Sequence, residues 1–130
     1  MDNNVKIMEL TTDMLNQAIQ TGKISVCTIG IGRIGLPTAL SFALSGLPTI
    51  GVDINSNLVD SINSGKFPLK DEPGYDVIFE EVMKKKNFHV TTKIDEALSK
   101  SDVVLLSLPT PMDSNNVPDY SALKNVAQQL

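Results

Sequence analysis

Three glycines at a fixed spacing are the residues of this chain whose pattern most clearly predicts a binding chemistry. Gly30, Gly32 and Gly35 form a G-x-G-x-x-G motif between an apolar run and a stretch with helical spacing. The first glycine of such a motif turns the chain off a strand, the second lets the backbone approach a phosphate, and the third lets a helix pack close to the strand. The N–H groups and dipole of that helix then face an anion. We therefore predict a diphosphate site made by Gly30, Ile31, Gly32, Arg33, Ile34 and Gly35.

One carboxylate follows the glycines at the distance expected for a ribose ligand. A second apolar segment, residues 47–52, ends at Asp53, about 20 residues beyond the glycine motif. A carboxylate at that point accepts hydrogen bonds from ribose hydroxyls and repels a 2′-phosphate, so the pattern favours NAD over NADP. The alternative is a structural glycine-rich turn with Asp53 as an ordinary loop residue. It is disfavoured because β-branched residues precede the motif, a helical pattern follows it, and the carboxylate stands where it is needed.

The segments that must position these residues alternate between strand-like and helix-like patterns. We predict strands at residues 24–29, 47–52, 88–92 and 102–108. We predict helices at residues 12–21, 34–44, 55–64, 75–86, 94–100 and 121–130. Such alternation predicts an α/β fold: a Rossmann-like, doubly wound, mostly parallel sheet with helices on both faces. Within it, Val77, Ile78, Val82 and Met83 are expected to be buried, and the apolar run 102–108 is expected to form a central strand.

The length of 130 residues suits one domain with its own core. We expect residues 1–22 to form an N-terminal helical extension and residues 23–130 to form the dinucleotide-binding domain. A complete doubly wound domain of this kind usually has six strands, whereas the pattern here supplies four. We therefore expect the domain to be C-terminally truncated in this sequence.

The composition of the chain excludes some classes of binding partner. The net charge of −4 argues against a nucleic-acid or membrane partner, and no apolar run approaches the length of about 20 residues that a membrane span needs. The polar N-terminus lacks the apolar core of a signal peptide, so a cytoplasmic location is expected. A single cysteine, Cys27, permits no internal disulfide and is predicted to be a small core residue. No metal site is predicted, and His89 has no titratable partner nearby in sequence for acid–base catalysis.

The chain also carries four ordered motifs that resemble a known family. They are GIGRIGLPTAL, GVDIN, FPLKDEPGYD and DVVLLSLPTPMD, and they resemble the N-terminal NAD-binding domain of the UDP-glucose/GDP-mannose dehydrogenase family over residues 23–130. The wording of the glycine motif is most similar to that of UDP-N-acetylmannosamine dehydrogenases. The resemblance implies that the full-length protein oxidises the C6 hydroxyl of a nucleotide sugar to a carboxylate in two NAD-linked steps, through a thioester on a catalytic cysteine. It also implies a homo-oligomer.

The resemblance assigns roles to individual residues of this sequence. The family's cofactor residues match residues 30–35 for the diphosphate and Asp53 for the ribose. The family's V-x-T-P segment matches Leu108, Pro109 and Thr110, which would line the nicotinamide side of the cofactor. The alternative for this last segment is a plain proline-rich exit from a strand.

The chain departs from the family pattern at several positions. The catalytic cysteine motif, of GGxCFPKD type, is absent, so the chain is expected to bind NAD without turning over a sugar. Leu58 stands where many members carry Lys or Arg, and Arg33 replaces the usual aromatic residue and is a candidate substitute cation. Glu72 lies in an E-P-G turn near the expected substrate entrance, with a turn and helix start as its alternative role.

Two other functions are open to this pattern. One is another dehydrogenase with the same opening fold, of the 3-hydroxyacid or 6-phosphogluconate type, which does not generally carry the long insert ending in E-P-G. The other is a stand-alone nucleotide-binding module without catalysis. The residues that read the sugar and its nucleobase are not among those identified. The pattern therefore does not distinguish between UDP-N-acetylmannosamine, UDP-N-acetylglucosamine and UDP-glucose.

Overall fold

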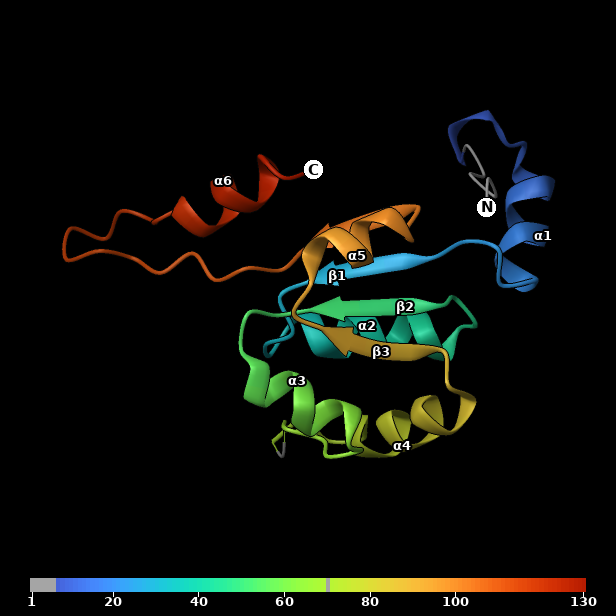
Figure 1. Ribbon diagram of the computed structural model, residues 1–130, viewed down its shortest axis with the longest axis horizontal. Helices are drawn as coiled ribbons and strands as arrows, with labels where there is room; N and C mark the ends of the chain where they lie inside the picture. Colours follow the sequence, from blue (N-terminus) through green and yellow to red (C-terminus); the bar gives the residue numbers. More distant parts are fainter. Residues whose placement is uncertain (1–6, 70) are drawn as a thin grey trace.

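Four parallel strands form the centre of the fold, which a computed structural model describes for residues 7–69 and 71–130 (Figure 1). The strands are β1 (Val26–Ile29), β2 (Thr49–Val52), β3 (Phe88–Thr91) and β4 (Val103–Leu106). Their order across the sheet is β3-β2-β1-β4, and every neighbouring pair is parallel. The predicted Rossmann-like parallel sheet is therefore confirmed. Residues 1–6 of the predicted extension and Lys70 of the predicted insert lie outside the described residues.

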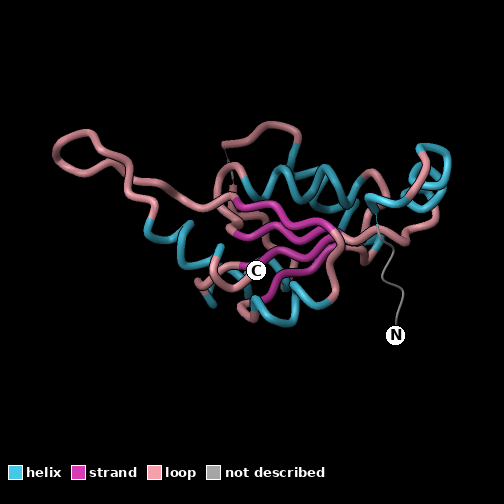
Figure 2. The backbone as a smooth tube through the Cα atoms, turned by 90° about the horizontal axis from the view of Figure 1, so that it is seen from above, coloured by secondary structure: helices cyan, strands magenta, loops and turns pink. Residues whose placement is uncertain are grey.

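Helices cover both faces of the sheet, as predicted (Figure 2). They are α1 (Thr12–Gln20), α2 (Gly35–Leu44), α3 (Ser56–Asn63), α4 (Tyr75–Lys85), α5 (Ile94–Ser99) and α6 (Ser121–Ala127), and a 3₁₀ turn, η1 (Ile7–Glu9), precedes them. Side chains of α2, α3 and α4 pack with β3 on one face, and side chains of α5 and α6 pack with β1 and β2 on the other. Among the described segments, every helix is too short or too polar to cross a membrane.

The path of the chain through the sheet reverses between β1 and β4. Helix α2 connects β1 to β2, and α3 and α4 connect β2 to β3 along the same face. Helix α5 lies on the opposite face and precedes β4, which pairs with the free side of β1. In sheets of this type, ligands bind outside the carboxyl ends of the strands at the point of reversal. The fold therefore places the glycine motif, which directly follows β1, at the expected ligand site.

The N-terminal helix α1 lies at the opposite end of β1 from the glycine turn (Figure 1). The Thr11 hydroxyl caps this helix by accepting a hydrogen bond from a backbone N–H of its first turn. Ala18 is buried with Ile24 and Leu47, so the helix covers apolar surface at the amino ends of the strands. The predicted domain boundary after residue 22 stays a prediction.

The buried face of α4 differs from the prediction at two positions. Val77 is 64% exposed, whereas Phe79 is 3% exposed and contacts Phe67, with ring centroids 5.4 Å apart. The apolar stripe runs through Ile78, Phe79 and Val82, which follow the i, i+1, i+4 positions on one side of a helix. Val77 was predicted to be buried because it is apolar, but it lies beside this stripe and faces solvent.

The position of β4 also differs from the prediction. The apolar run at residues 102–108 was expected to form a central strand, yet β4 pairs with β1 alone within residues 7–69 and 71–130 and so lies at the edge of the sheet. Its side chains are half-buried or exposed, and Leu106 is 37% exposed. Apolar residues on both faces of a strand indicate what covers those faces, and they do not report how many strands flank it.

Thr28 in β1 is fully buried, and its hydroxyl oxygen has no hydrogen-bond partner among the described residues. A buried hydroxyl without a partner lowers stability. We therefore expect Thr28→Val, which keeps the shape and removes the hydroxyl, to raise the free energy of unfolding by about 1 kcal/mol in urea denaturation. Thr49→Val is the matched control and should lower stability, because the buried Thr49 hydroxyl donates to the Leu47 carbonyl at 2.8 Å. A similar loss of stability in both variants would contradict this explanation.

Cys27 is a buried core residue of β1, as predicted, and burial raises the pKa of its thiol to about 11, an effect that a hydrogen bond with Ser101 opposes. The folded chain therefore favours the neutral thiol. Because the unfolded thiol titrates near 9, this stabilisation is complete below that pH and is lost as the pH rises toward 11. We expect Cys27→Ala to lack this part of the alkaline loss of stability. A thiol reagent at neutral pH should label the unchanged chain only after denaturation, and rapid labelling of the folded chain would count against a buried thiol.

Candidate functional site

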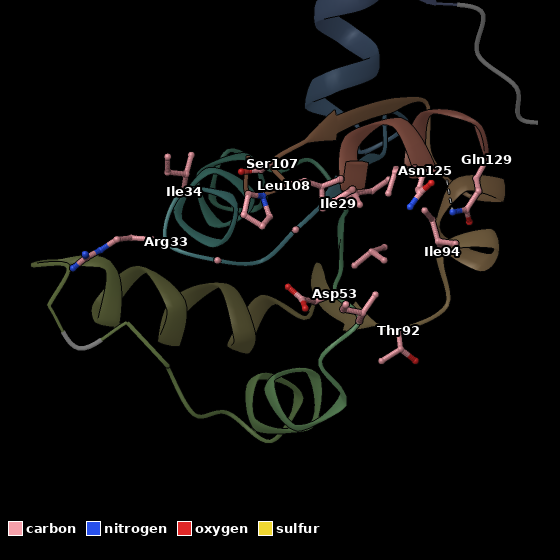
Figure 3. Close-up of a pocket in the computed structure, with 17 residues that line it drawn as sticks. Ile29, Arg33, Ile34, Asp53, Thr92, Ile94, Ser107, Leu108, Asn125 and Gln129 are labelled. Carbon is pink, nitrogen blue, oxygen red and sulfur yellow. Dashed lines mark hydrogen bonds between the residues drawn. The ribbon is translucent and has the colours of Figure 1, made fainter. Parts of the chain in front are cut away.

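A cleft of about 790 Å³ lies at the carboxyl ends of the strands (Figure 3). Its walls are the glycine turn after β1, the segments that follow β2 and β3, the exit of β4, and one side of α6. The predicted site residues that line it are Gly30, Gly32, Arg33, Ile34, Asp53, Leu108 and Pro109. Ile31 and Gly35 are buried behind the turn, and Thr110 is exposed on the loop that leaves β4.

The three glycines of the motif meet different surroundings. At Gly30, φ is +97° and an added Cβ would overlap the Ser107 carbonyl oxygen at the exit of β4. At Gly35, an added Cβ would overlap the Gly30 carbonyl oxygen, so α2 packs directly on the end of β1. At Gly32, an added Cβ would meet no described atom within 4 Å, and this residue lines the cleft. The turn thus combines a sharp change of direction, close helix packing and one face that is open to a ligand.

The glycine turn leaves backbone donors unused at the N-terminus of α2. Within the described part of the chain, no acceptor binds the N–H groups of Gly32, Arg33 and Ile34. Ile34 is the N-cap residue and contributes no side-chain hydrogen bond. The Leu36 N–H, two residues beyond Ile34, binds the Gly32 carbonyl at 3.1 Å. Unpaired donors at the positive end of a helix dipole form a binding site for an anion such as a diphosphate.

Asp53 connects the glycine turn to the start of α3. Its Oδ2 accepts a hydrogen bond from the Ile31 N–H at 3.0 Å, and its Oδ1 accepts one from the Asn55 N–H at 3.0 Å. The carboxylate is therefore fixed at the end of β2 beside the turn (Figure 3). Each carboxylate oxygen keeps a further lone pair, which fits a ribose hydroxyl donor. A phosphate on that ribose would instead meet a negative charge.

Arg33 is joined to the insert that precedes α4. Its Nε lies 3.2 Å from Oε1 of Glu72, and a terminal nitrogen lies 4.0 Å from Oδ2 of Asp71. Figure 3 shows the Arg33 side chain directed away from Asp53. Because Arg33 and Asp71 are largely exposed, these ion pairs add little to stability. They connect the glycine turn to the E-P-G turn, a contact that sequence reasoning did not predict.

Beyond β4, the chain leaves the sheet in a long loop and returns as α6 (Figures 1 and 2). Leu108 and Pro109 line the cleft at the start of this loop. Met112 and Pro118 form an isolated bridge across it. Thr110 lies between these parts and is exposed, so the structure brings only the first two residues of the predicted nicotinamide segment to the cleft.

The sequence did not predict that α6 forms one wall of the cleft. Ala122, Asn125, Val126 and Gln129 line the cleft, and they come from α6 and the residues directly after it. The sequence predicted this helix but assigned it no function. The available signal is the i, i+3, i+4, i+7 spacing of these residues, which places them on one side of a helix. Because a long loop precedes α6, the sequence does not indicate which part of the fold this side of the helix contacts.

The geometry of the cleft fits a dinucleotide, and comparison with known proteins identifies the family. Residues 24–130 match the NAD binding domain of the UDP-glucose/GDP-mannose dehydrogenase family. The chain belongs to this family. NAD is therefore the cofactor of the domain, as predicted, and the unpaired N–H groups beside an open glycine are consistent with its diphosphate.

Individual members of the dehydrogenase family show the extent of the similarity. The chain is 44% identical over 91 residues to the UDP-N-acetyl-D-mannosamine dehydrogenase of Campylobacter jejuni, covering 70% of this chain and 21% of that protein. It is 33% identical over 116 residues to an NDP-N-acetyl-D-galactosaminuronic acid dehydrogenase of Ralstonia nicotianae, covering 89% and 26%. The ternary complex of GDP-mannose dehydrogenase from Pseudomonas aeruginosa superposes with a TM-score of 0.77 at 28% identity, covering 82% and 24%. The chain thus spans about a quarter of the length of these relatives.

Proposed function

We propose that this chain is the cofactor-binding part of a nucleotide-sugar 6-dehydrogenase. Such an enzyme oxidises the C6 hydroxyl of a UDP-sugar to a carboxylate in two NAD-linked steps. The position of Asp53 against the glycine turn is the observation that carries the proposal, because it combines a diphosphate site and a ribose acceptor in one cleft. A UDP-N-acetylmannosamine-type substrate is supported by the Campylobacter jejuni relative, whose name carries that sugar.

The proposed roles of the residues follow their places around the cleft. The backbone of residues 30–35 binds the diphosphate, with the N–H groups of Gly32, Arg33 and Ile34 as donors. Asp53 binds the ribose of the adenosine half. The segment from Leu108 to Thr110 borders the nicotinamide half, with the first two residues already at the cleft wall. Bound NAD would accept the hydride from the sugar, while this chain binds and orients the cofactor.

The proposal places the rest of the reaction outside these 130 residues. The one cysteine of the chain, Cys27, is buried in β1 and is not accessible for a thioester. We propose that the sugar is bound mostly by other parts of a full-length, homo-oligomeric enzyme in the cytoplasm. We also propose that residues 1–22 are a helical extension and residues 23–130 the NAD-binding domain of that enzyme.

Two measurements on the purified chain test this function together. Calorimetric titration should show saturable binding of NAD. An assay of NADH absorbance with UDP-N-acetylmannosamine and NAD should show no turnover above a blank without protein. Failure to bind NAD would overturn the proposed function, and sustained NADH production would overturn the proposal that the chain alone lacks catalysis.

A further inference from the structure

The cleft continues past Asp53 to an end whose chemistry differs from that of the glycine turn. Ile94 lies at this end (Figure 3), and Ile54 and Val126 are further apolar residues that line the cleft. Two amide side chains of the α6 segment, Asn125 and Gln129, lie beside Ile94 (Figure 3). We propose that these two amides select a purine with a 6-amino group, which is adenine, over purines with a 6-carbonyl group. This inference rests on the proposed function, since the base in question is that of NAD.

The apolar lining suits the flat faces of a base. If Asp53 holds the ribose, the attached base extends from it to the side away from the glycine turn, where Ile94 lies (Figure 3). Ile54, the next residue after Asp53, lines the same cleft. Ile54 is 97% exposed, which leaves a large apolar side chain at the edge of the cleft without protein contacts to cover it. A stacked ring would cover it. Stacking alone accepts any base, so discrimination needs polar groups at the ring edge.

Gln129 supplies such a group. Its Nε2 donates a hydrogen bond to the backbone carbonyl of Asn125 at 3.3 Å, which orients the side-chain amide. The amide oxygen, Oε1, therefore points the other way, and no donor in the described residues binds it. Adenine presents a donor at its 6-amino group, whereas guanine and hypoxanthine present an acceptor oxygen there. An unpaired acceptor on the protein thus favours adenine and repels the 6-carbonyl bases.

Asn125 adds a second amide on the same side of the helix, four residues before Gln129. Its side chain contributes both a donor and an acceptor, which suits a ring nitrogen next to the 6-amino group. Asn125 and Gln129 are both exposed, so neither amide is needed for packing. Gln128 is the same residue type one position away and does not line the cleft, so it is a matched control.

Calorimetric titration with NAD and with nicotinamide hypoxanthine dinucleotide tests the inference. These ligands differ at the 6-substituent of the base and at the adjacent N1, which is an acceptor in adenine and carries a hydrogen in hypoxanthine. We expect the unchanged chain to prefer NAD by roughly tenfold, since one hydrogen bond is lost and one acceptor is left unpaired. Gln129→Ala should lower the affinity for NAD by roughly 3- to 10-fold. It should also reduce the preference for NAD over the hypoxanthine dinucleotide to about twofold or less. Asn125→Ala should shift NAD affinity in the same direction, and Gln128→Ala should change neither value.

Two further outcomes separate this inference from the proposed function. Gln129→Glu keeps acceptor oxygens at the same position and should retain the preference for the 6-amino base. A chain that binds both dinucleotides equally, or a Gln129→Ala variant that keeps the full preference, would overturn the inference and leave the proposed function intact. A chain that binds neither dinucleotide would overturn both. Equal thermal unfolding midpoints of the variants would show that the exposed α6 side chains act on the ligand and not on folding.

Discussion

Gly35→Ala is expected to lower the free energy of unfolding by about 3 kcal/mol or more, or to prevent folding. An added Cβ at this position would overlap the Gly30 carbonyl oxygen and lie 3.3 Å from Cβ of Ser107. The overlapping atom belongs to the backbone of a tight turn, so it cannot rotate away as a flexible side chain would. Relief requires α2 to separate from β1, which opens the packing of the buried Leu36 and Leu40. Urea denaturation followed by circular dichroism measures the loss.

Gly32→Ala is the matched control within the same motif. An added Cβ there would meet no described atom within 4 Å, so stability should change by less than about 1 kcal/mol. The added methyl group would instead stand in the cleft beside the unpaired N–H groups and should weaken NAD binding. If Gly35→Ala were as stable as Gly32→Ala, the close packing of α2 on the end of β1 would not be the reason for the third glycine.

Asp53→Ala is expected to remove the discrimination between NAD and NADP and to lower the affinity for NAD by roughly 30-fold. In the proposed complex the carboxylate supplies charged acceptors to the ribose hydroxyls and repels a 2′-phosphate, and the variant would do neither. Calorimetric titration of both cofactors measures the two affinities. Asp60→Ala controls for the change in net charge, because Asp60 is an exposed residue of α3. If the variant still prefers NAD over NADP by the same factor as the unchanged chain, another group must distinguish the ribose from its 2′-phosphate form.

Asp53→Asn separates the binding role of this side chain from its structural role. The amide oxygen of Asn can still accept the hydrogen bond from the Ile31 N–H, which Asp53 accepts at 3.0 Å. The amide NH2 group cannot accept the second hydrogen bond, from the Asn55 N–H, but that bond is exposed and its loss should cost little stability. The negative charge that repels a 2′-phosphate is lost. We expect Asp53→Asn to keep the thermal unfolding midpoint close to that of the unchanged chain while the affinity for NADP rises toward that for NAD. A large drop in the midpoint would mean that the charge itself holds the glycine turn.

The elements of this fold were predictable because their signals are local. The strands follow β-branched and apolar runs, and α3 starts where Asn55 accepts a hydrogen bond from the Leu58 N–H. The glycine motif predicted its own turn, since the bulk that a Cβ would add at Gly30 and Gly35 is excluded by backbone atoms. Such features depend on neighbours in sequence, and periodicity and residue type report them directly.

The parts that sequence reasoning missed depend on contacts between distant residues. The bond from Ile31 to Asp53 joins positions 22 residues apart, and the ion pair of Arg33 with Glu72 joins positions 39 apart. No local pattern encodes these distances. The same limit explains the cleft wall at Gln129, because a long loop separates α6 from β4. It also explains the edge position of β4, whose apolar residues describe its faces and not its neighbours.

We propose that NAD lies with its diphosphate over the N-terminus of α2 and its adenosine ribose on Asp53. The most direct test is an NMR titration of the ¹⁵N-labelled chain with NAD, followed at backbone amide resonances. We predict the largest shifts at Gly32, Arg33 and Ile34, whose N–H groups have no acceptor in the described residues, and at Ile31, whose N–H binds Asp53. Saturable binding that leaves these four amide resonances unchanged and shifts others would contradict this position of NAD.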